Sequence, residues 1–183
     1  MAEALAPPLP DDIDRLAQDV LREACARDVL LACAESCTGG LLASLLTDIP
    51  GQSHAFERGF VTYTNDAKHE MIGVPLELLQ DHGAVSEAAA LAMAEGALAH
   101  SRADIAVSVT GFAEDAPGET GGLVHFACAR RAGPTRHRIE RFAPPNRMTV
   151  RLGAVRTSLT LLLEALQDTP RRETPRSGTQ GDT

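Results

Sequence analysis

The chain has 183 residues, of which 44% are hydrophobic and 3% aromatic, and its formal net charge is −8. A chain of this length and composition is expected to form one globular domain with a core of Leu, Ala, Val and Ile. The acidic charge and the scarcity of aromatic side chains argue against nucleic acid or an anionic membrane surface as the partner.

The sequence also indicates a compartment. Its apolar runs fall short of the roughly 20 residues that a membrane-spanning helix needs. Residues 1–10 lack the basic and long apolar segments of a signal peptide, so we expect a cytoplasmic protein. Four cysteines suit a reducing compartment, and the spacing of Cys33 and Cys37 without a nearby His pair does not predict a zinc site.

The N-terminal half alternates segments of helical and strand periodicity. Asp11 or Asp12 is expected to cap the first helix, Asn65 or Asp66 a short helix, and Ser86 a long one. The expected elements are a helix over residues 12–27, a strand over 29–34, a helix over 41–47, a strand over 55–63, short helices over 65–71 and 76–81, and a long helix over 86–100.

The C-terminal half holds the most apolar strand pattern of the chain. Residues 105–109 are almost continuously apolar, which predicts a buried, central strand. A loop is expected over residues 112–121. Gly133 and Pro134 are expected to join the next two strands into an antiparallel hairpin. The two strands of this hairpin are expected over residues 123–131 and 136–142, and a final helix is expected over 147–167.

Alternating helices and strands with one hairpin predict a three-layer α/β/α sandwich with a mixed sheet. The folded domain is expected over residues 12–167, between a loose leader at 1–11 and a disordered tail at 168–183. Folds of this class bind ligands at the carboxyl ends of their strands. The turns that follow three of the strands therefore form the candidate site: residues 36–40, 63–68 and 110–111.

Residues 34–40 read AESCTGG and link a strand pattern to a helix pattern. Gly39 and Gly40 allow a ligand to approach the backbone closely. The first N–H groups of the helix are expected to point at that ligand and to favour a negative charge. Ser36 and Cys37 are both candidate nucleophiles, although an ordinary helix N-cap at Ser36 or Thr38 explains the same residues.

A serine nucleophile needs a base, because the free hydroxyl is weak. The six histidines are scattered, and each is expected to be a surface or connector residue. A partly desolvated Lys68 has a lowered pKa and can take the proton, with the Tyr63 hydroxyl as a relay or stabilising group. The alternative is a solvated charge at Lys68 and a strand-end side chain at Tyr63.

Four sequence blocks resemble the CinA C-terminal domain family, whose enzymatic members are nicotinamide-nucleotide amidases. They are AESCTGG at residues 34–40, GFVTYTNDAK at 59–68, HGAVSE at 82–87 and SVTG at 108–111. The blocks occur in the family's order, and the resemblance extends over residues 12–167. It implies a stand-alone domain that hydrolyses nicotinamide mononucleotide to nicotinic acid mononucleotide and ammonia, in pyridine nucleotide salvage.

The resemblance also implies roles for individual residues. Ser36 resembles the nucleophile, Lys68 its base, and Tyr63 a second proton-handling or orienting group. It implies an oxyanion hole from the N–H groups of Cys37, Thr38, Gly39 and Gly40, and a pocket lined by Thr38, Ser53, Asn65, Thr110 and Gly111. Arg147 or Arg151 is expected to hold the substrate phosphate. The family needs no metal or organic cofactor, and its members are commonly homodimers.

Residues 112–122 depart from the family pattern. They lack its glycine-rich loop and instead carry Glu114, Asp115 and Glu119, which are expected to repel a phosphate. Two alternatives therefore stand beside the mononucleotide amidase. One is a catalytically weakened nucleotide-binding or interaction protein in a competence or DNA-damage response. The other is an amidase for a related, less anionic amide.

Overall fold

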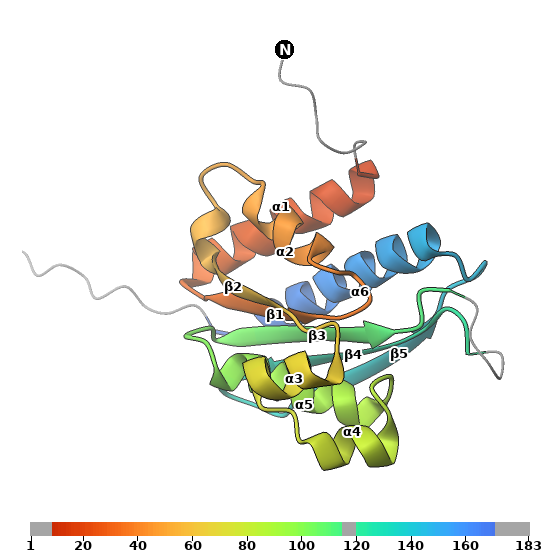
Figure 1. The fold of residues 1–183 in the computed structure, drawn as a ribbon. Coiled ribbons are helices and arrows are strands. Elements are labelled where there is room, and N and C mark those ends of the chain that lie inside the picture. The colour runs from red at the N-terminus through yellow and green to blue at the C-terminus, as the bar shows by residue number, and fades with distance from the viewer. Residues whose placement is uncertain (1–8, 115–119, 171–183) are drawn as a thin grey trace, which may run out of the picture.

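The computed structural model describes residues 9–114 and 120–170, in which five strands form one sheet (Figure 1). The strand order is β2-β1-β3-β4-β5. The strands are β1 (Leu31–Glu35), β2 (Phe56–Val61), β3 (Ile105–Gly111), β4 (Leu123–Arg130) and β5 (Arg136–Arg141). The helices are α1 (Asp11–Arg27), α2 (Leu41–Thr47), the 3-10 turn η1 (Ser53–Ala55), α3 (Asn65–Ile72), α4 (Leu76–His82), α5 (Glu87–Ala99) and α6 (Arg147–Gln167).

The sheet is mixed. Strand β1 pairs in parallel with both β2 and β3, whereas β4 pairs antiparallel with β3 and with β5. In the register of β1 and β3, Leu31 lies opposite Ile105 and Glu35 opposite Val109. The carboxyl ends of β1, β2 and β3 therefore meet at one edge of the sheet, which brings the three predicted turns together.

Helices cover both faces of the sheet. Helices α1, α2 and α6 lie on one face, and α3, α4 and α5 on the other (Figure 1). Along β1, Leu31 and Cys33 pack in the core beneath α1 and α6, while Ala32 and Ala34 pack with the helices of the opposite face. This arrangement confirms the predicted three-layer sandwich. It also explains the apolar run of β3, the central strand, since both of its faces are covered.

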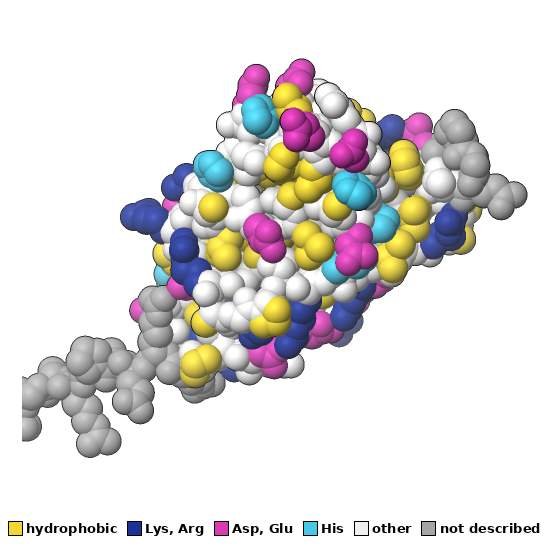
Figure 2. Space-filling view, turned by 90° about the horizontal axis from the view of Figure 1, so that it is seen from below, with side chains coloured by type: hydrophobic (Ala, Val, Ile, Leu, Met, Phe, Trp, Pro, Cys, Tyr) yellow, Lys and Arg dark blue, Asp and Glu magenta, His cyan; other side chains and the backbone are white. Residues whose placement is uncertain are grey.

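Figure 2 views the molecule from the side of α3, α4 and α5, where acidic and histidine side chains are spread among hydrophobic ones. Several large apolar side chains of the molecule are exposed, among them Met71 of α3 at 42% and Leu76 of α4 at 38%. Among the described helices, none combines the length and the apolarity that a membrane crossing requires.

The predicted elements are present, but two helix caps were predicted wrongly. Helix α1 begins after Pro10 without a side-chain cap. Its aspartates lie within the first turn, where their negative charges interact favourably with the helix dipole. Helix α3 is capped by Thr64, whose hydroxyl accepts from the N–H of Ala67 at 3.1 Å, and not by Asn65 or Asp66. The predicted leader and tail lie mostly outside the described residues.

Candidate active site

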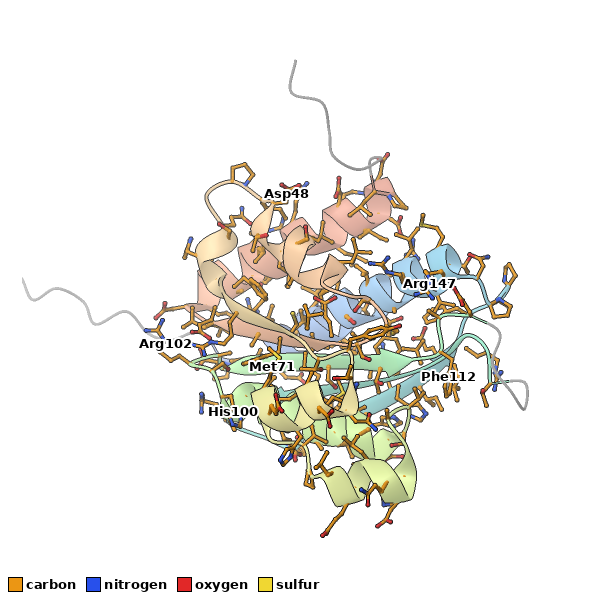
Figure 3. All side chains as sticks on the ribbon, viewed as in Figure 1. Asp48, Met71, His100, Arg102, Phe112 and Arg147 are labelled. Carbon is orange, nitrogen blue, oxygen red and sulfur yellow. The ribbon has the colours of Figure 1, made fainter. Side chains whose placement is uncertain are left out.

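The carboxyl edge of the parallel strands contains a pocket of about 350 Å³. Figure 3 shows Phe112 and Arg147 at this end of the sheet, and His100 and Arg102 at the opposite end. The residues that line the pocket are Ser36, Cys37, Tyr63, Lys68, Ala84, Val85, Thr110, Gly111, Phe112, Ala113, Glu114 and Arg147. All three predicted turns thus contribute to one concave site, as the strand order requires.

Lys68 reaches the serine of the first turn from helix α3. Its Nζ atom lies 3.3 Å from Ser36 Oγ, 2.8 Å from the Thr62 carbonyl oxygen and 3.4 Å from that of Tyr63. The end of β2 is held in place because the Thr62 N–H donates to the Glu35 carbonyl at 2.8 Å. The lysine side chain is 1% exposed, which overturns the alternative of a solvated charge.

Burial lowers the pKa of Lys68 below its ordinary value, because the charged ammonium loses its water. A neutral amine has two N–H donors and one lone pair. The two carbonyl oxygens of Thr62 and Tyr63 can accept from the donors, and the lone pair can then accept from the Ser36 hydroxyl. The arrangement is therefore suited to removing the proton from Ser36.

Glu35, at the end of β1, is a site residue that the sequence reasoning missed. Its side chain is fully buried, and its carboxylate accepts from the N–H groups of Gly40, Leu42 and Ala43 at 3.1, 3.1 and 2.8 Å. The expectation that the first N–H groups of α2 point at a ligand is therefore wrong, because this carboxylate occupies them. The available signal was a glutamate a few residues before a helix that has no acidic residue in its own first turn.

The N–H groups of Cys37 and Thr38 have no backbone acceptor within the turn. Among the described residues, no backbone carbonyl accepts from either of them, whereas the Gly39 N–H donates to the Ser36 carbonyl at 3.1 Å. Gly39 and Gly40 have φ values of +61° and +91°, a left-handed backbone that glycine adopts without strain. The turn thus folds back tightly after Ser36 and leaves the N–H groups of Cys37 and Thr38 as two donors next to Ser36 in the chain.

The two candidate arginines occupy different places. Arg151 of α6 binds the turn itself, with Nε and Nη2 lying 3.2 and 2.6 Å from the Thr38 carbonyl oxygen. Arg147, at the first position of α6, lines the pocket and pairs with Glu114 through Nη2 at 2.7 Å. The pKa of Arg147 is raised chiefly by Glu114 and also by the Tyr63 phenol. Arg147 is therefore the arginine at the pocket mouth.

Some predicted residues lie outside the pocket lining. Ser53 belongs to η1, which precedes β2 and lies at the opposite edge of the sheet. Asn65 is exposed and lies at the first position of α3, after the Thr64 cap. Thr38 is buried behind the turn, and its hydroxyl has no partner among the described residues. The acidic residues Asp115 and Glu119 lie outside the described part of the chain.

The remaining members of the predicted set differ in exposure and packing. Tyr63 is 65% exposed at the mouth, while Cys37 is 7% exposed and burial raises the pKa of its thiol to about 12. A thiol with that pKa is a poor source of thiolate. A Cβ at Gly111 would lie 2.7 Å from the Val124 side chain and 2.8 Å from the Leu123 carbonyl oxygen, so the close pairing of β3 and β4 needs glycine there.

The histidine prediction was partly wrong. His125 of β4 is 9% exposed rather than a surface residue, and its Nδ1 lies 3.0 Å from His137 Nε2 of β5. The described pocket lining contains no histidine, which leaves Lys68 as its basic partner for Ser36. Within residues 9–114 and 120–170, no three His, Cys, Asp or Glu side chains are placed to hold a metal ion.

Fold and site together define a three-layer α/β protein with a buried serine–lysine pair at the carboxyl edge of its parallel strands. Residues 13–166 match the CinA C-terminal domain, and the chain belongs to that family. A solved structure from Agrobacterium tumefaciens, described as competence/damage inducible protein CihA, aligns with a TM-score of 0.82 and 45% identity over 88% of this chain and 99% of that one.

Relatives of two lengths match this chain. The Escherichia coli K12 protein named nicotinamide-nucleotide amidohydrolase PncC is 45% identical over 162 residues, 86% of this chain and 98% of that protein. A putative competence-damage inducible protein from Symbiobacterium thermophilum is 53% identical over 123 residues, 66% of this chain and 29% of that protein. The chain spans 29% to 36% of the length of three such longer relatives.

Proposed function

We propose that this chain hydrolyses the carboxamide of nicotinamide mononucleotide, which yields nicotinic acid mononucleotide and ammonia. The observation that carries the proposal is the buried Lys68 Nζ at 3.3 Å from Ser36 Oγ in the wall of the pocket. The 45% identity to a relative that is named for this activity and matched over nearly its full length supports the choice of substrate.

In the first step, neutral Lys68 takes the proton of the Ser36 hydroxyl while Oγ attacks the carboxamide carbon. The carbonyl oxygen becomes an oxyanion, which the N–H groups of Cys37 and Thr38 stabilise. Each such donor contributes about 3–4 kcal/mol in enzymes where it has been removed. Arg151 supports this arrangement, because it holds the Thr38 carbonyl from behind.

In the second step, the Lys68 ammonium returns the proton to the amide nitrogen, the carbon–nitrogen bond breaks, and ammonia leaves. A water molecule then attacks the acyl group on Ser36, with neutral Lys68 taking its proton. Collapse of that intermediate releases the carboxylic acid product, and the proton on Lys68 returns to Ser36 Oγ. Both halves of the reaction thus use the same serine–lysine pair. Lys68 takes the proton from Ser36 Oγ when the acyl group is formed and returns a proton to it when the acyl group is released.

The remaining pocket residues bind and orient the substrate in this proposal. Tyr63 lies at the mouth beside Arg147, where its phenol orients the nucleotide or handles a second proton. Arg147 is the more exposed of the two basic residues in the described pocket lining and meets the phosphate, whose geometry suits a guanidinium. Thr110 and Gly111 shape the wall that faces the pyridine ring, with the Thr110 hydroxyl fixed on the Ala84 carbonyl at 2.7 Å.

The test is to incubate the purified chain with nicotinamide mononucleotide and to measure ammonia and nicotinic acid mononucleotide. Ser36→Ala is the inactive control, and Ser44→Ala, which changes an exposed serine of α2, is the matched active control. We expect release with the wild-type chain and with Ser44→Ala only. Release that does not exceed the Ser36→Ala level in a folded protein would refute the amidase.

The Glu114–Arg147 ion pair favours a second candidate, a catalytically weakened family member that acts as a nucleotide-binding or interaction protein in a competence or DNA-damage response. The pair occupies the cation that the phosphate needs. Calorimetry with nicotinamide mononucleotide, together with the ammonia assay, distinguishes the two candidates. Binding of the mononucleotide without release of ammonia supports the second candidate.

We also propose that residues 12–167 form the working unit, as a homodimer in the cytoplasm. Sedimentation of the full chain and of residues 12–167 alone tests the dimer, and a monomer in both would contradict it. Fractionation of cells that produce the chain tests its location.

A further inference from the structure

The mouth of the pocket contains an ion pair between Arg147 and Glu114, and the reaction scheme gives Glu114 no role. Arg147 Nε and Nη2 lie 2.8 and 2.7 Å from the same oxygen, Glu114 Oε1. In the described part of the chain, only Oε1 of this carboxylate has a donor, which leaves Oε2 able to accept a further hydrogen bond. Both residues line the same pocket as Ser36 and Lys68.

The positions of the two charges matter because the described pocket lining holds two basic side chains in all. Lys68 is buried and engaged with Ser36, so Arg147 is the one at the mouth. The side chains of Arg147 and Glu114 are 53% and 61% exposed, and exposed ion pairs are weak. An incoming anion can therefore open the pair, but the displaced carboxylate then lies close to the anion on the same pocket wall and repels it.

We propose that Glu114 determines substrate charge at this site by competing with the phosphate for Arg147. Glu114 then weakens the binding of the phosphorylated amide and leaves the ribosyl carboxamide without the phosphate, which carries only the positive charge of its pyridinium ring, nearly unaffected. Glu114 Oε2 can accept from the sugar hydroxyl that stands where the mononucleotide carries its phosphate. This inference rests on the proposed amidase function and refines its substrate class, since the mononucleotide is turned over but is bound less tightly because of Glu114.

The test compares nicotinamide mononucleotide with nicotinamide riboside in the wild type and in Glu114→Gln. Glutamine keeps the size and removes the charge. We expect kcat/KM for the mononucleotide to rise about tenfold through a lower KM, because Arg147 no longer pairs with Glu114 and is free to bind the phosphate. For the riboside we expect less than a twofold change. The matched control is Glu164→Gln, which removes the carboxylate of another exposed pair, with Arg138, at the far end of α6.

A double variant separates competition for Arg147 from a general effect of charge. In an Arg147→Ala background, Glu114→Gln should raise mononucleotide kcat/KM much less than tenfold, because there is no cation left to compete for. An unchanged ratio of the two substrates in Glu114→Gln, or the same gain in Glu164→Gln, would overturn the inference.

A binding measurement keeps the inference independent of turnover. Calorimetry on Ser36→Ala and on Ser36→Ala with Glu114→Gln uses nicotinamide mononucleotide and inorganic phosphate as probes. Tighter binding of both probes in the second protein supports competition between Glu114 and the phosphate. This holds even if no variant releases ammonia, because the lack of ammonia would refute the amidase proposal but not the competition. Equal binding in the two proteins refutes the role of Glu114 whether or not the amidase is active.

Discussion

Lys68 Nζ lies 3.3 Å from Ser36 Oγ, although the two residues are 32 positions apart in the chain. Ser36 follows β1, and Lys68 lies within α3 after β2. The parallel pairing of β1 and β2 places the end of one strand beside the end of the other. A hydroxyl and a buried amine thereby lie within hydrogen-bond distance of each other at the pocket wall.

The pH dependence of turnover should follow Lys68. Because burial lowers the pKa of Lys68 below its ordinary value of 10.5, the fraction of neutral amine rises with pH through that lowered pKa. We expect kcat/KM to rise in parallel and then level off. Lys68→Arg should lose about 10²–10⁴-fold, since a guanidinium stays charged. A pH series from 6 to 10 measures both, and a flat wild-type profile would contradict the assignment of Lys68 as base.

The same group should make folding stability depend on pH. When the folded pKa of a lysine lies below its unfolded pKa, the unfolded chain binds more protons between the two values. The free energy of unfolding of the wild type should therefore rise as pH increases across that window, up to 10.5. Lys68→Met should remove this rise. Urea unfolding at several pH values tests it, and equal slopes in both proteins would show that the pKa is not lowered.

Cys37 should be dispensable for chemistry. Its thiol is buried and its pKa is raised to about 12, so it supplies little thiolate at neutral pH. We expect Cys37→Ala to keep turnover within a few-fold of wild type, with a stability loss of about 1 kcal/mol from the lost packing. Ser36→Ala is the contrasting variant. If Cys37→Ala were folded and as inactive as Ser36→Ala, the nucleophile would have to be reassigned.

Removing the Glu35 side chain should damage the turn more than removing an exposed glutamate. Glu35→Ala leaves three N–H groups, those of Gly40, Leu42 and Ala43, without an acceptor. Each buried unsatisfied donor costs about 1–3 kcal/mol, so we expect a loss of about 3 kcal/mol or more. Chemical unfolding measures it against Glu77→Ala, an exposed position of α4. A loss no larger than in that control would show that the carboxylate does not hold the helix start.

The two arginines should differ in their kinetic effects. Arg151 donates to the Thr38 carbonyl, so Arg151→Ala should disturb the turn and lower kcat. Arg147 lies at the mouth, so Arg147→Ala should raise KM for the phosphorylated substrate with little change in kcat. Steady-state kinetics of both variants measure this split. The reverse pattern would assign the phosphate to Arg151.

Much of the architecture could be predicted because secondary structure follows local patterns. The apolar run at residues 105–109 predicted the central strand β3, and the Gly133–Pro134 turn predicted the β4–β5 hairpin. The carboxyl-edge location of the site followed from parallel strands. The burial of Lys68 could not be predicted, because a lysine at helical spacing is equally consistent with a solvated face and its surroundings come from β1 and β2.

The sequence by itself determined the order and type of the elements, since hydrophobic periodicity and turn residues act within a few positions of one another. It also placed Ser36, Tyr63 and Lys68 in the segments that follow two strands. Only the tertiary structure decided which donors and acceptors meet: Glu35 on the start of α2, Arg151 on Thr38 and Glu114 on Arg147. Polar partners depend on distances between segments remote in the chain, and a local pattern carries no information about those distances.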